Sequence, residues 1–229
     1  MYDKAKPLPL PNWLGSSHSH PPLPAPRDQN PFDMYAIMDL IHTLEPDLII
    51  ETGTANGGSA LMWASMLQLT RPGSGRVITI DVNEPVKESW AGVSTKDPTQ
   101  NPMWKQYVTF LKGSSLDPRV LSMVREAAAA AKVVLVLLDS DHTEHHVQLE
   151  AQAYCPLVTV GSYCIIEDTK LSRFSAVGGP IPGIQRFLER HLDFIADRDR
   201  EPFYTQHVGG YLRRTQVSNG TQNKGAARN

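Results

Sequence analysis

The stretch Asp47-Leu-Ile-Ile-Glu-Thr-Gly-Thr-Ala-Asn-Gly-Gly-Ser59 decides the fold that we expect for this chain. Its first part is a short apolar run, typical of a buried strand, that ends in the carboxylate Glu51 and the glycine Gly53. Apolar residues at helical spacing follow, at Ala60, Leu61, Ala64 and Leu67. The stretch therefore predicts a strand, a glycine turn and a helix in direct succession.

The alternation of strands and helices continues in both directions from this stretch. We expect a helix from Pro31 that stops before Pro46, further strands at 76–81, 107–111, 133–138 and 161–166, and helices at 117–131, 143–155 and 184–192. The run 133–138 is apolar without interruption, which is typical of a parallel strand covered on both faces, so it should be central. The whole pattern predicts an α/β fold with a Rossmann-like, doubly wound and mostly parallel sheet.

The two ends of the chain depart from this alternation. Phe203–Gln206 and Gly209–Arg213 are expected as antiparallel strands, which would add a C-terminal hairpin to the sheet. Residues 1–30 are rich in proline and predict an extended arm, and the polar residues 215–229 predict a disordered tail. One folded domain, residues 31–214, is expected between them.

The composition excludes several classes of partner. A formal net charge of −2 argues against a general nucleic-acid binder. The longest apolar run, Val133 to Leu138, is far shorter than the roughly 20 residues of a membrane-spanning helix, so no membrane partner is expected. The N-terminal residues hold no apolar core of a secretory signal. We expect a cytoplasmic protein that acts on a small molecule, and we leave open whether it forms a homo-oligomer.

The two cysteines, Cys155 and Cys164, flank the expected turn between the helix 143–155 and the next strand. Two cysteines do not make the disulfide framework of a small secreted domain, and their spacing is not a common zinc pattern. We expect reduced, buried thiols.

The glycine turn after the first strand is suited to a ligand. Gly53, Gly57 and Gly58 let the backbone pass close to it, and the following helix offers unpaired amides to a carboxylate or phosphate. Ala55 occupies the middle position of what would otherwise be Gly-x-Gly-x-x-Gly, which weakens a dinucleotide interpretation.

Two polar residues after neighbouring strands extend this interpretation. Asp81 ends the second strand, where a carboxylate can accept hydrogen bonds from ribose hydroxyls. Ser114 follows the third strand and could border the base. Together with the turn they favour a nucleoside cofactor, and the alternative is a tight structural turn beside a solvated aspartate.

Four carboxylates follow two later strands of the expected sheet, at Asp139, Asp141, Glu167 and Asp168. Brought together, they would repel one another unless a cation or a proton intervened, and an all-oxygen set favours a hard ion such as Mg²⁺. The alternative is that Asp139 or Asp141 only caps the helix that follows.

Two side chains beside this acid cluster are candidates for a general base. An unperturbed imidazole has a pKa of about 6.5, so His142 is a residue type that could accept a proton from a hydroxyl at neutral pH. Lys170 is its rival, two positions after Asp168. His145 and His146, further along the helix, are expected on a solvated surface.

Five segments together resemble the cephalosporin hydroxylase-like family, whose members look like metal-dependent O-methyltransferases despite the name. These segments are Asn30-Pro-Phe-Asp33, Asp47–Thr54 with Gly57-Gly-Ser-Ala60, Leu138-Asp-Ser-Asp-His-Thr143, Gly161-Ser-Tyr163 with Glu167-Asp-Thr169, and Gly209-Gly-Tyr-Leu212. The resemblance implies a class I methyltransferase fold, a divalent ion on the acids after the two later strands, and S-adenosylmethionine as the methyl donor. We expect this cofactor near Glu51, Gly53, Thr54, Gly57, Ser59, Asp81, Ser114 and Asp139.

Two positions depart from the wider catechol and caffeoyl-type methyltransferases. Those relatives carry an Asp-Asn pair where this chain has Glu167-Asp168, which adds negative charge and leaves the ligand set open. They also carry a base lysine three positions after the first aspartate, where this chain has His142.

The leading hypothesis is Mg²⁺-assisted transfer of a methyl group from S-adenosylmethionine to an oxygen of a small molecule. The resemblance suggests a sugar, a natural-product hydroxyl or a carboxylate as the acceptor. One alternative is a nicotinamide-dependent oxidoreductase or hydroxylase, and another is a non-catalytic nucleoside-binding protein.

Overall fold

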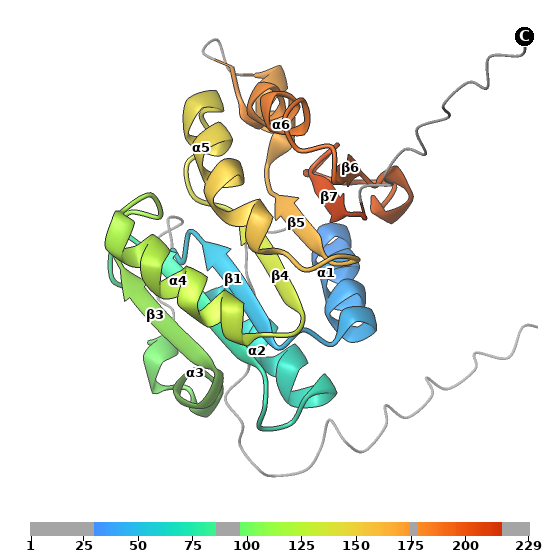
Figure 1. The fold of residues 1–229 in the computed structure, drawn as a ribbon. Coiled ribbons are helices and arrows are strands. Elements are labelled where there is room, and N and C mark those ends of the chain that lie inside the picture. The colour runs from blue at the N-terminus through green and yellow to red at the C-terminus, as the bar shows by residue number, and fades with distance from the viewer. Residues whose placement is uncertain (1–29, 86–96, 175–177, 217–229) are drawn as a thin grey trace, which may run out of the picture.

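The computed structural model describes residues 30–85, 97–174 and 178–216. The expected arm and tail therefore lie outside the described residues, apart from the few residues at which they join the domain. The described residues form one layered α/β structure (Figure 1).

A seven-stranded sheet forms the centre, in the order β3-β2-β1-β4-β5-β7-β6. Its strands are β1 Leu48–Thr52, β2 Arg76–Asp81, β3 Val108–Lys112, β4 Val134–Leu138, β5 Tyr163–Ile166, β6 Phe194–Ala196 and β7 Tyr211–Arg214. The first five strands of that order are parallel and the last two pairings are antiparallel. The strands β1 and β4 are buried throughout and pair with each other, as a continuous apolar run predicts. The Rossmann-like fold with an antiparallel C-terminal end is confirmed.

Helices cover both faces of this sheet. They are α1 Pro31–Leu44, α2 Gly58–Thr70, α3 Pro102–Tyr107, α4 Pro118–Ala130, α5 Glu144–Tyr154 and α6 Pro180–Leu188, with short 3₁₀ helices η2 Pro98–Gln100, η3 Cys155–Leu157, η4 Thr169–Arg173 and η5 Arg198–Arg200. One apolar core lies between the sheet and α4, α5 and α6, and a second lies between the sheet and α1, α2 and α3. Figure 1 shows α4 and α5 in front of the sheet, with α1 and α2 behind it.

Local sequence explains where several helices begin. The side chain of Asn30 accepts a hydrogen bond from the Phe32 N–H at the start of α1, and that of Asp117 accepts one from the Arg119 N–H at the start of α4. Proline occupies the first position of both helices, where no intrahelical N–H is needed.

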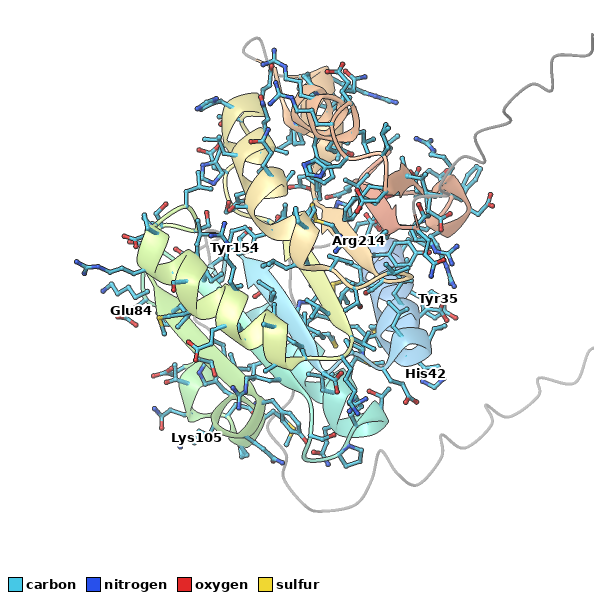
Figure 2. All side chains as sticks on the ribbon, in the orientation of Figure 1. Tyr35, His42, Glu84, Lys105, Tyr154 and Arg214 are labelled. Carbon is cyan, nitrogen blue, oxygen red and sulfur yellow. A yellow bond between two sulfur atoms is a disulfide. The ribbon has the colours of Figure 1, made fainter. Side chains whose placement is uncertain are left out.

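Charged side chains such as Glu84 and Lys105 lie at the rim of the domain (Figure 2). Among the described residues, no helix is long and apolar enough to cross a membrane.

The partner of the last strand was predicted wrongly. β7 pairs with β6, and Phe203–Gln206 is not a strand. Phe203 is 93% exposed, and the Gln206 N–H donates to the Asp33 carboxylate of α1 instead of to a neighbouring strand. An aromatic, apolar stretch resembles an edge strand in sequence, but here its hydrogen bonds are made with a helix terminus.

Two helices also differ from the prediction. The helix expected at 184–192 begins at Pro180, because prolines in a first helical turn remove only N–H groups that have no intrahelical acceptor. Helix α3 was not predicted at all. Asn101 caps it by accepting from the Met103 N–H, and Pro102 opens it.

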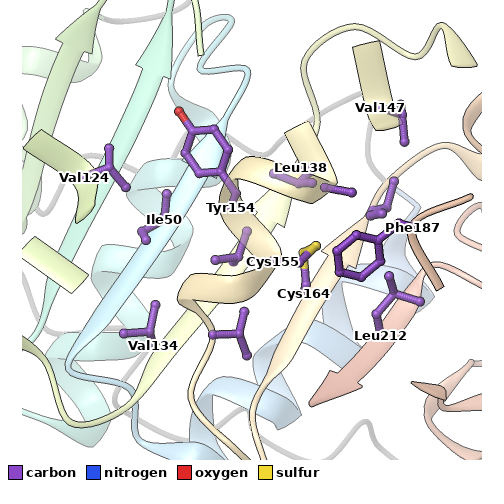
Figure 3. Close-up of a cluster of buried hydrophobic side chains, with 14 of the residues drawn as sticks. Ile50, Val124, Val134, Leu138, Val147, Tyr154, Cys155, Cys164, Phe187 and Leu212 are labelled. Atoms are coloured by element: carbon purple, nitrogen blue, oxygen red, sulfur yellow. A yellow bond between two sulfur atoms is a disulfide. The ribbon is translucent and has the colours of Figure 1, made fainter. Parts of the chain in front are cut away.

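The prediction of reduced thiols is wrong, because Cys155 and Cys164 form a disulfide. Their Cα atoms are 5.2 Å apart, since η3 and the turn after it bring the end of α5 back beside β5. Both residues are fully buried in the core under α5 and α6, beside Phe187 and Leu212 (Figure 3).

Candidate active site

The loops that follow the parallel strands meet at one edge of the sheet, around a cavity of about 740 Å³. Its lining comes from the segments after β1, β2, β3 and β4 and from α5, and comprises Gly53, Ala55, Ile80, Asp81, Val82, Asn83, Gly113, Ser114, Ser115, Asp139, Ser140, Asp141 and His146. A crevice at the carboxyl ends of the strands is where sheets of this kind bind nucleoside ligands.

The glycine turn is shaped by its contact with the loop after β4. Gly53 has φ +90°, and a Cβ built there would lie 1.9 Å from the carbonyl oxygen of Asp139, so no larger residue fits. Ala55 is also left-handed, at φ 45°, and its N–H donates to Oδ2 of Asp81 over 2.9 Å. Asp81 thus ties the turn to β2 while it lines the cavity, where its oxygens keep lone pairs for further donors.

Three of the residues expected at the cofactor lie beneath this turn and outside the cavity lining. Glu51 accepts hydrogen bonds from Nε1 of Trp63 at 2.8 Å, from Oγ1 of Thr79 at 2.6 Å and from Ser59. Burial raises the pKa of the Glu51 carboxyl above its usual range. Thr54 is buried and its hydroxyl is hydrogen-bonded to that of Thr79.

Two more cofactor candidates are Gly57, which does not line the cavity, and Ser114, which does. Gly57 precedes α2 in a left-handed conformation, packed against the Trp104 side chain. Ser114 lines the cavity beyond β3, and its hydroxyl accepts from the Leu116 N–H.

The loops after β4 and β5 bring together Asp139, His142 and Asp168. One ligand atom from each lies within 4.8 Å of the others. Nε2 of His142 is 3.7 Å from Oδ1 of Asp139 and 3.8 Å from Oδ2 of Asp168. Burial raises the pKa of Asp139 well above its usual range, and the charges of Glu167 and Asp168 raise it further. The site is therefore crowded with negative charge, which a bound cation would offset.

The other two predicted metal ligands are placed differently. Oδ1 of Asp141 accepts from the Thr143 N–H over 2.8 Å, which forms a local turn just before α5, whose N-cap residue is Thr143 and not Asp141. Burial raises the pKa of Asp141, but the hydrogen bonds from Thr143 outweigh it and lower the pKa overall. Glu167 is buried, with Oε2 3.5 Å from Nε2 of His207.

The two candidate bases lie on different sides of Asp168. Nζ of Lys170 is 3.9 Å from Oδ1 of Asp168, whereas His142 approaches Oδ2. His142 also lines a second, smaller cavity of about 290 Å³, whose wall is completed by Asp141, Thr143, Leu171, Phe174 and Gly178. Asp141 lines both cavities, so the two adjoin at this loop.

Residues 22–215 match the sequence model of a family described as Rhamnosyl O-methyltransferase/CmcI. The chain belongs to this family. The assignment agrees with the resemblance seen in the sequence and makes the chain an S-adenosylmethionine-dependent O-methyltransferase. The family assignment gives no support to the alternative of a nicotinamide-dependent oxidoreductase or hydroxylase.

Individual relatives of this methyltransferase are similar over most of their length. A rhamnosyl O-methyltransferase of Mycobacterium leprae is 29% identical over 192 residues, which cover 79% of this chain and 76% of that one. The Mycobacterium tuberculosis protein of the same name is 27% identical over 189 residues, 79% and 72% of the two chains. A structure of CmcI with Mg and SAM superposes with a TM-score of 0.59 at 20% identity, over 94% of this chain and 88% of that one. The CmcI structure therefore has the same fold as this chain.

His146 is a residue of the larger cavity that the sequence analysis placed wrongly. His146 was expected on a solvated surface, yet it lines the cavity, with Nε2 3.2 Å from Oγ of Ser140 and 3.3 Å from Oε1 of Glu150. Its hydrogen bond with Glu150 raises the pKa of His146. Glu150 is buried on the apolar side of α5, in register with Val147, Ala151 and Tyr154. The spacing of four residues between His146 and this acidic position was the available signal.

His207 is a second residue that the sequence analysis did not single out, and it contacts both Glu167 and Asp168. His207 is buried and its Nδ1 accepts a hydrogen bond from the Asp168 N–H over 2.8 Å. Burial lowers the pKa of His207, so the neutral ring is favoured. Asp33, the last residue of the Asn30–Asp33 segment, is fully buried beside it.

Proposed function

We propose that this methyltransferase transfers the methyl group of S-adenosylmethionine to a hydroxyl of a sugar-containing small molecule, with Asp139 and Asp168 as ligands of a divalent ion of the Mg²⁺ type. The observation that carries this proposal is the position of His142. Its Nε2 lies between the two carboxylates, and its ring faces the smaller cavity where that cavity adjoins the larger one. A base, two anionic ligands and two adjoining cavities are what transfer between two substrates requires.

The smaller cavity supports an acceptor with both polar and apolar faces. His142 and Thr143 provide its polar wall, and Leu171 and Phe174 provide its apolar wall. A sugar ring presents hydroxyls at its edge and C–H groups on its faces, so it matches such a wall better than a small carboxylate does. The name of the mycobacterial relatives, rhamnosyl O-methyltransferase, agrees with this acceptor class.

The donor atoms fit a divalent cation. Asp139 and Asp168 are hard oxygen ligands beside a single imidazole, and the charge crowded around Asp139 favours a cation over two free carboxylates. Glu167 adds to that charge, and Asp141 remains a sequence-based candidate ligand. When bound, such an ion lowers the pKa of a coordinated hydroxyl and orients it. The CmcI structure with Mg and SAM agrees with this assignment.

The residues of the chain account for the rest of the reaction. Asp81 would hold the ribose, and the backbone of the Gly53 turn would lie against the cofactor. His142 takes the proton of the acceptor hydroxyl as the oxygen–methyl bond forms and the sulfur–methyl bond breaks. The products are a methyl ether and S-adenosylhomocysteine, and the proton leaves from His142 to solvent.

The test is methyl transfer from labelled S-adenosylmethionine to a panel of rhamnosides, catechols and carboxylic acids, with Mg²⁺ or with EDTA. We expect transfer to a sugar hydroxyl that EDTA, Asp139→Asn and Asp168→Asn each reduce by at least tenfold. The matched control is Asp199→Asn, because Asp199 is an exposed aspartate remote from both cavities. Undiminished transfer in EDTA and in both site variants would refute the metal, and transfer to catechols or acids alone would refute the sugar acceptor.

A further inference from the structure

The backbone of Asp168 is held in an unusual conformation. It is left-handed, with φ 52° and ψ 30°, a region that residues with a side chain adopt less readily than glycine does. Glycine would adopt this conformation without cost but would have no carboxylate. The backbone N–H of Asp168 donates to Nδ1 of His207 over 2.8 Å, and this hydrogen bond supports the left-handed conformation.

The same hydrogen bond defines the tautomer of His207. Because Nδ1 accepts a proton from the Asp168 N–H, the ring hydrogen of a neutral His207 is on Nε2. Nε2 is buried and lies 3.5 Å from Oε2 of Glu167 and 3.7 Å from Oδ2 of Asp33. The His207 ring thus accepts a hydrogen bond from the backbone of Asp168 and faces the side chain of Glu167.

The segment that carries His207 is itself anchored to the N-terminal helix. Asp33, in the first turn of α1, accepts hydrogen bonds from the Thr205 hydroxyl, from the Gln206 N–H at 2.7 Å and from the Tyr211 hydroxyl at 3.1 Å. Asp33 is fully buried, so these donors satisfy a carboxylate that water does not reach.

Backbone hydrogen bonds join the His207 segment to the loop after β5 on both sides of Asp168. The Ile166 N–H donates to the carbonyl of Gly210 over 2.9 Å, and the Lys170 N–H donates to that of Gln206 over 3.0 Å. A Cβ at Gly210 would lie 2.2 Å from the carbonyl oxygen of Ile166, so the two segments are in close backbone contact. The backbone of residues 206–210 therefore constrains the backbone conformation of residues 166–170.

We propose that His207 is a positioning residue of this enzyme: its Nδ1 holds Asp168 in the left-handed conformation that directs its carboxylate toward Asp139 and His142, and Asp33 anchors the segment that carries it. The role in metal binding rests on the proposed function. The role in shaping the Asp168 backbone does not. His207 lines neither cavity, so we assign its effect on the site to the residues that it contacts, Asp168 and Glu167.

Two isosteric variants separate the two ring nitrogens. His207→Asn keeps an acceptor near the position of Nδ1, whereas His207→Gln keeps a polar group near Nε2 and removes that acceptor. His145→Gln on the exposed side of α5 controls for the exchange of histidine for glutamine. The full-length proteins are compared by Mn²⁺ affinity from electron paramagnetic resonance, by S-adenosylmethionine affinity without metal, and by the NMR signal and hydrogen exchange of the Asp168 amide.

We expect His207→Gln to weaken Mn²⁺ binding by about 10- to 100-fold and to speed exchange at the Asp168 amide, with cofactor affinity changed less than threefold. His207→Asn should stay within about threefold of the wild type in Mn²⁺ affinity and keep the amide protected. Equal losses in both variants, or no loss in either, would overturn the proposal. If the wild type binds no Mn²⁺, the metal assignment fails, and the Asp168 amide in the two variants still decides whether His207 positions that residue.

Discussion

The α-carbon of Gly53 lies so close to the carbonyl group of Asp139 that a Cβ on Gly53 would be 1.9 Å from the Asp139 oxygen. The turn that faces the cofactor cavity and the loop that carries the first acid of the metal group are therefore packed backbone to backbone. A change at one of them must displace the other.

Gly53→Ala tests this packing. Besides the left-handed strain of about 1–2 kcal/mol, the new methyl group must push the 139–140 backbone away, so we expect a larger loss of stability and at least tenfold weaker cofactor binding. Gly161→Ala is the matched control, because Gly161 has the same φ of +90° and no atom within 4 Å of its built Cβ. Thermal unfolding and calorimetric titration with S-adenosylmethionine would check both variants. Equal effects of the two substitutions would contradict the packing argument.

The two candidate bases should respond differently to removal. His142→Asn is expected to lower kcat by about 10²- to 10⁴-fold, because His142 lines the acceptor cavity between Asp139 and Asp168. Lys170→Met should lower it by less than tenfold, since Nζ is 3.9 Å from Oδ1 on the other side of Asp168. Steady-state kinetics with saturating cofactor would compare them. A larger loss in the lysine variant would reverse the assignment of the base.

The disulfide between Cys155 and Cys164 should stabilise the fold by restricting the unfolded chain. The two cysteines are nine positions apart in the sequence, and closing a loop of that size is worth about 2–3 kcal/mol. The double substitution Cys155→Ala and Cys164→Ala should lose about that much in urea unfolding. Dithiothreitol should destabilise the wild type similarly once it is unfolded and refolded, and it should leave the double variant unchanged. A wild type indifferent to the reductant would show that the bond does not contribute.

The pair His146 and Glu150 predicts a pH dependence of stability. The hydrogen bond that His146 donates to the Glu150 carboxylate raises the pKa of His146 in the folded state, so the folded protein binds a proton more tightly than the unfolded chain does. The resulting stabilisation is fully present below the ordinary histidine pKa of about 6.5 and is lost as the pH rises through the folded-state pKa. The difference in free energy of unfolding between the wild type and His146→Asn should therefore shrink from about pH 5.5 to about pH 8.5. The same difference measured in the Glu150→Gln background should be flat, and a slope of opposite sign would contradict the pairing.

Much of this protein follows from local sequence. The apolar runs that become β1 and β4, the glycine turn after β1 and the prolines that open α1 and α4 could each be interpreted within a window of about ten residues, because apolar strand patterns, left-handed turns and helix caps depend on neighbours in the chain. The positions of Asp81, Asp139 and Asp168 at strand ends followed from the rule that parallel strands end at one edge.

Other features were decided by the tertiary structure, because they join segments far apart in the chain. His207 meets Asp168 across 39 residues, and Asp33 meets Tyr211 across 178. The partner of β7 and the bond between Cys155 and Cys164 likewise depend on how the chain returns after a turn. The chain alone determined which residue types lie at the active edge of the sheet. Only packing decided which of the acids meet around His142 and which residues hold them there, because those distances are set by contacts between elements and not by spacing along the sequence.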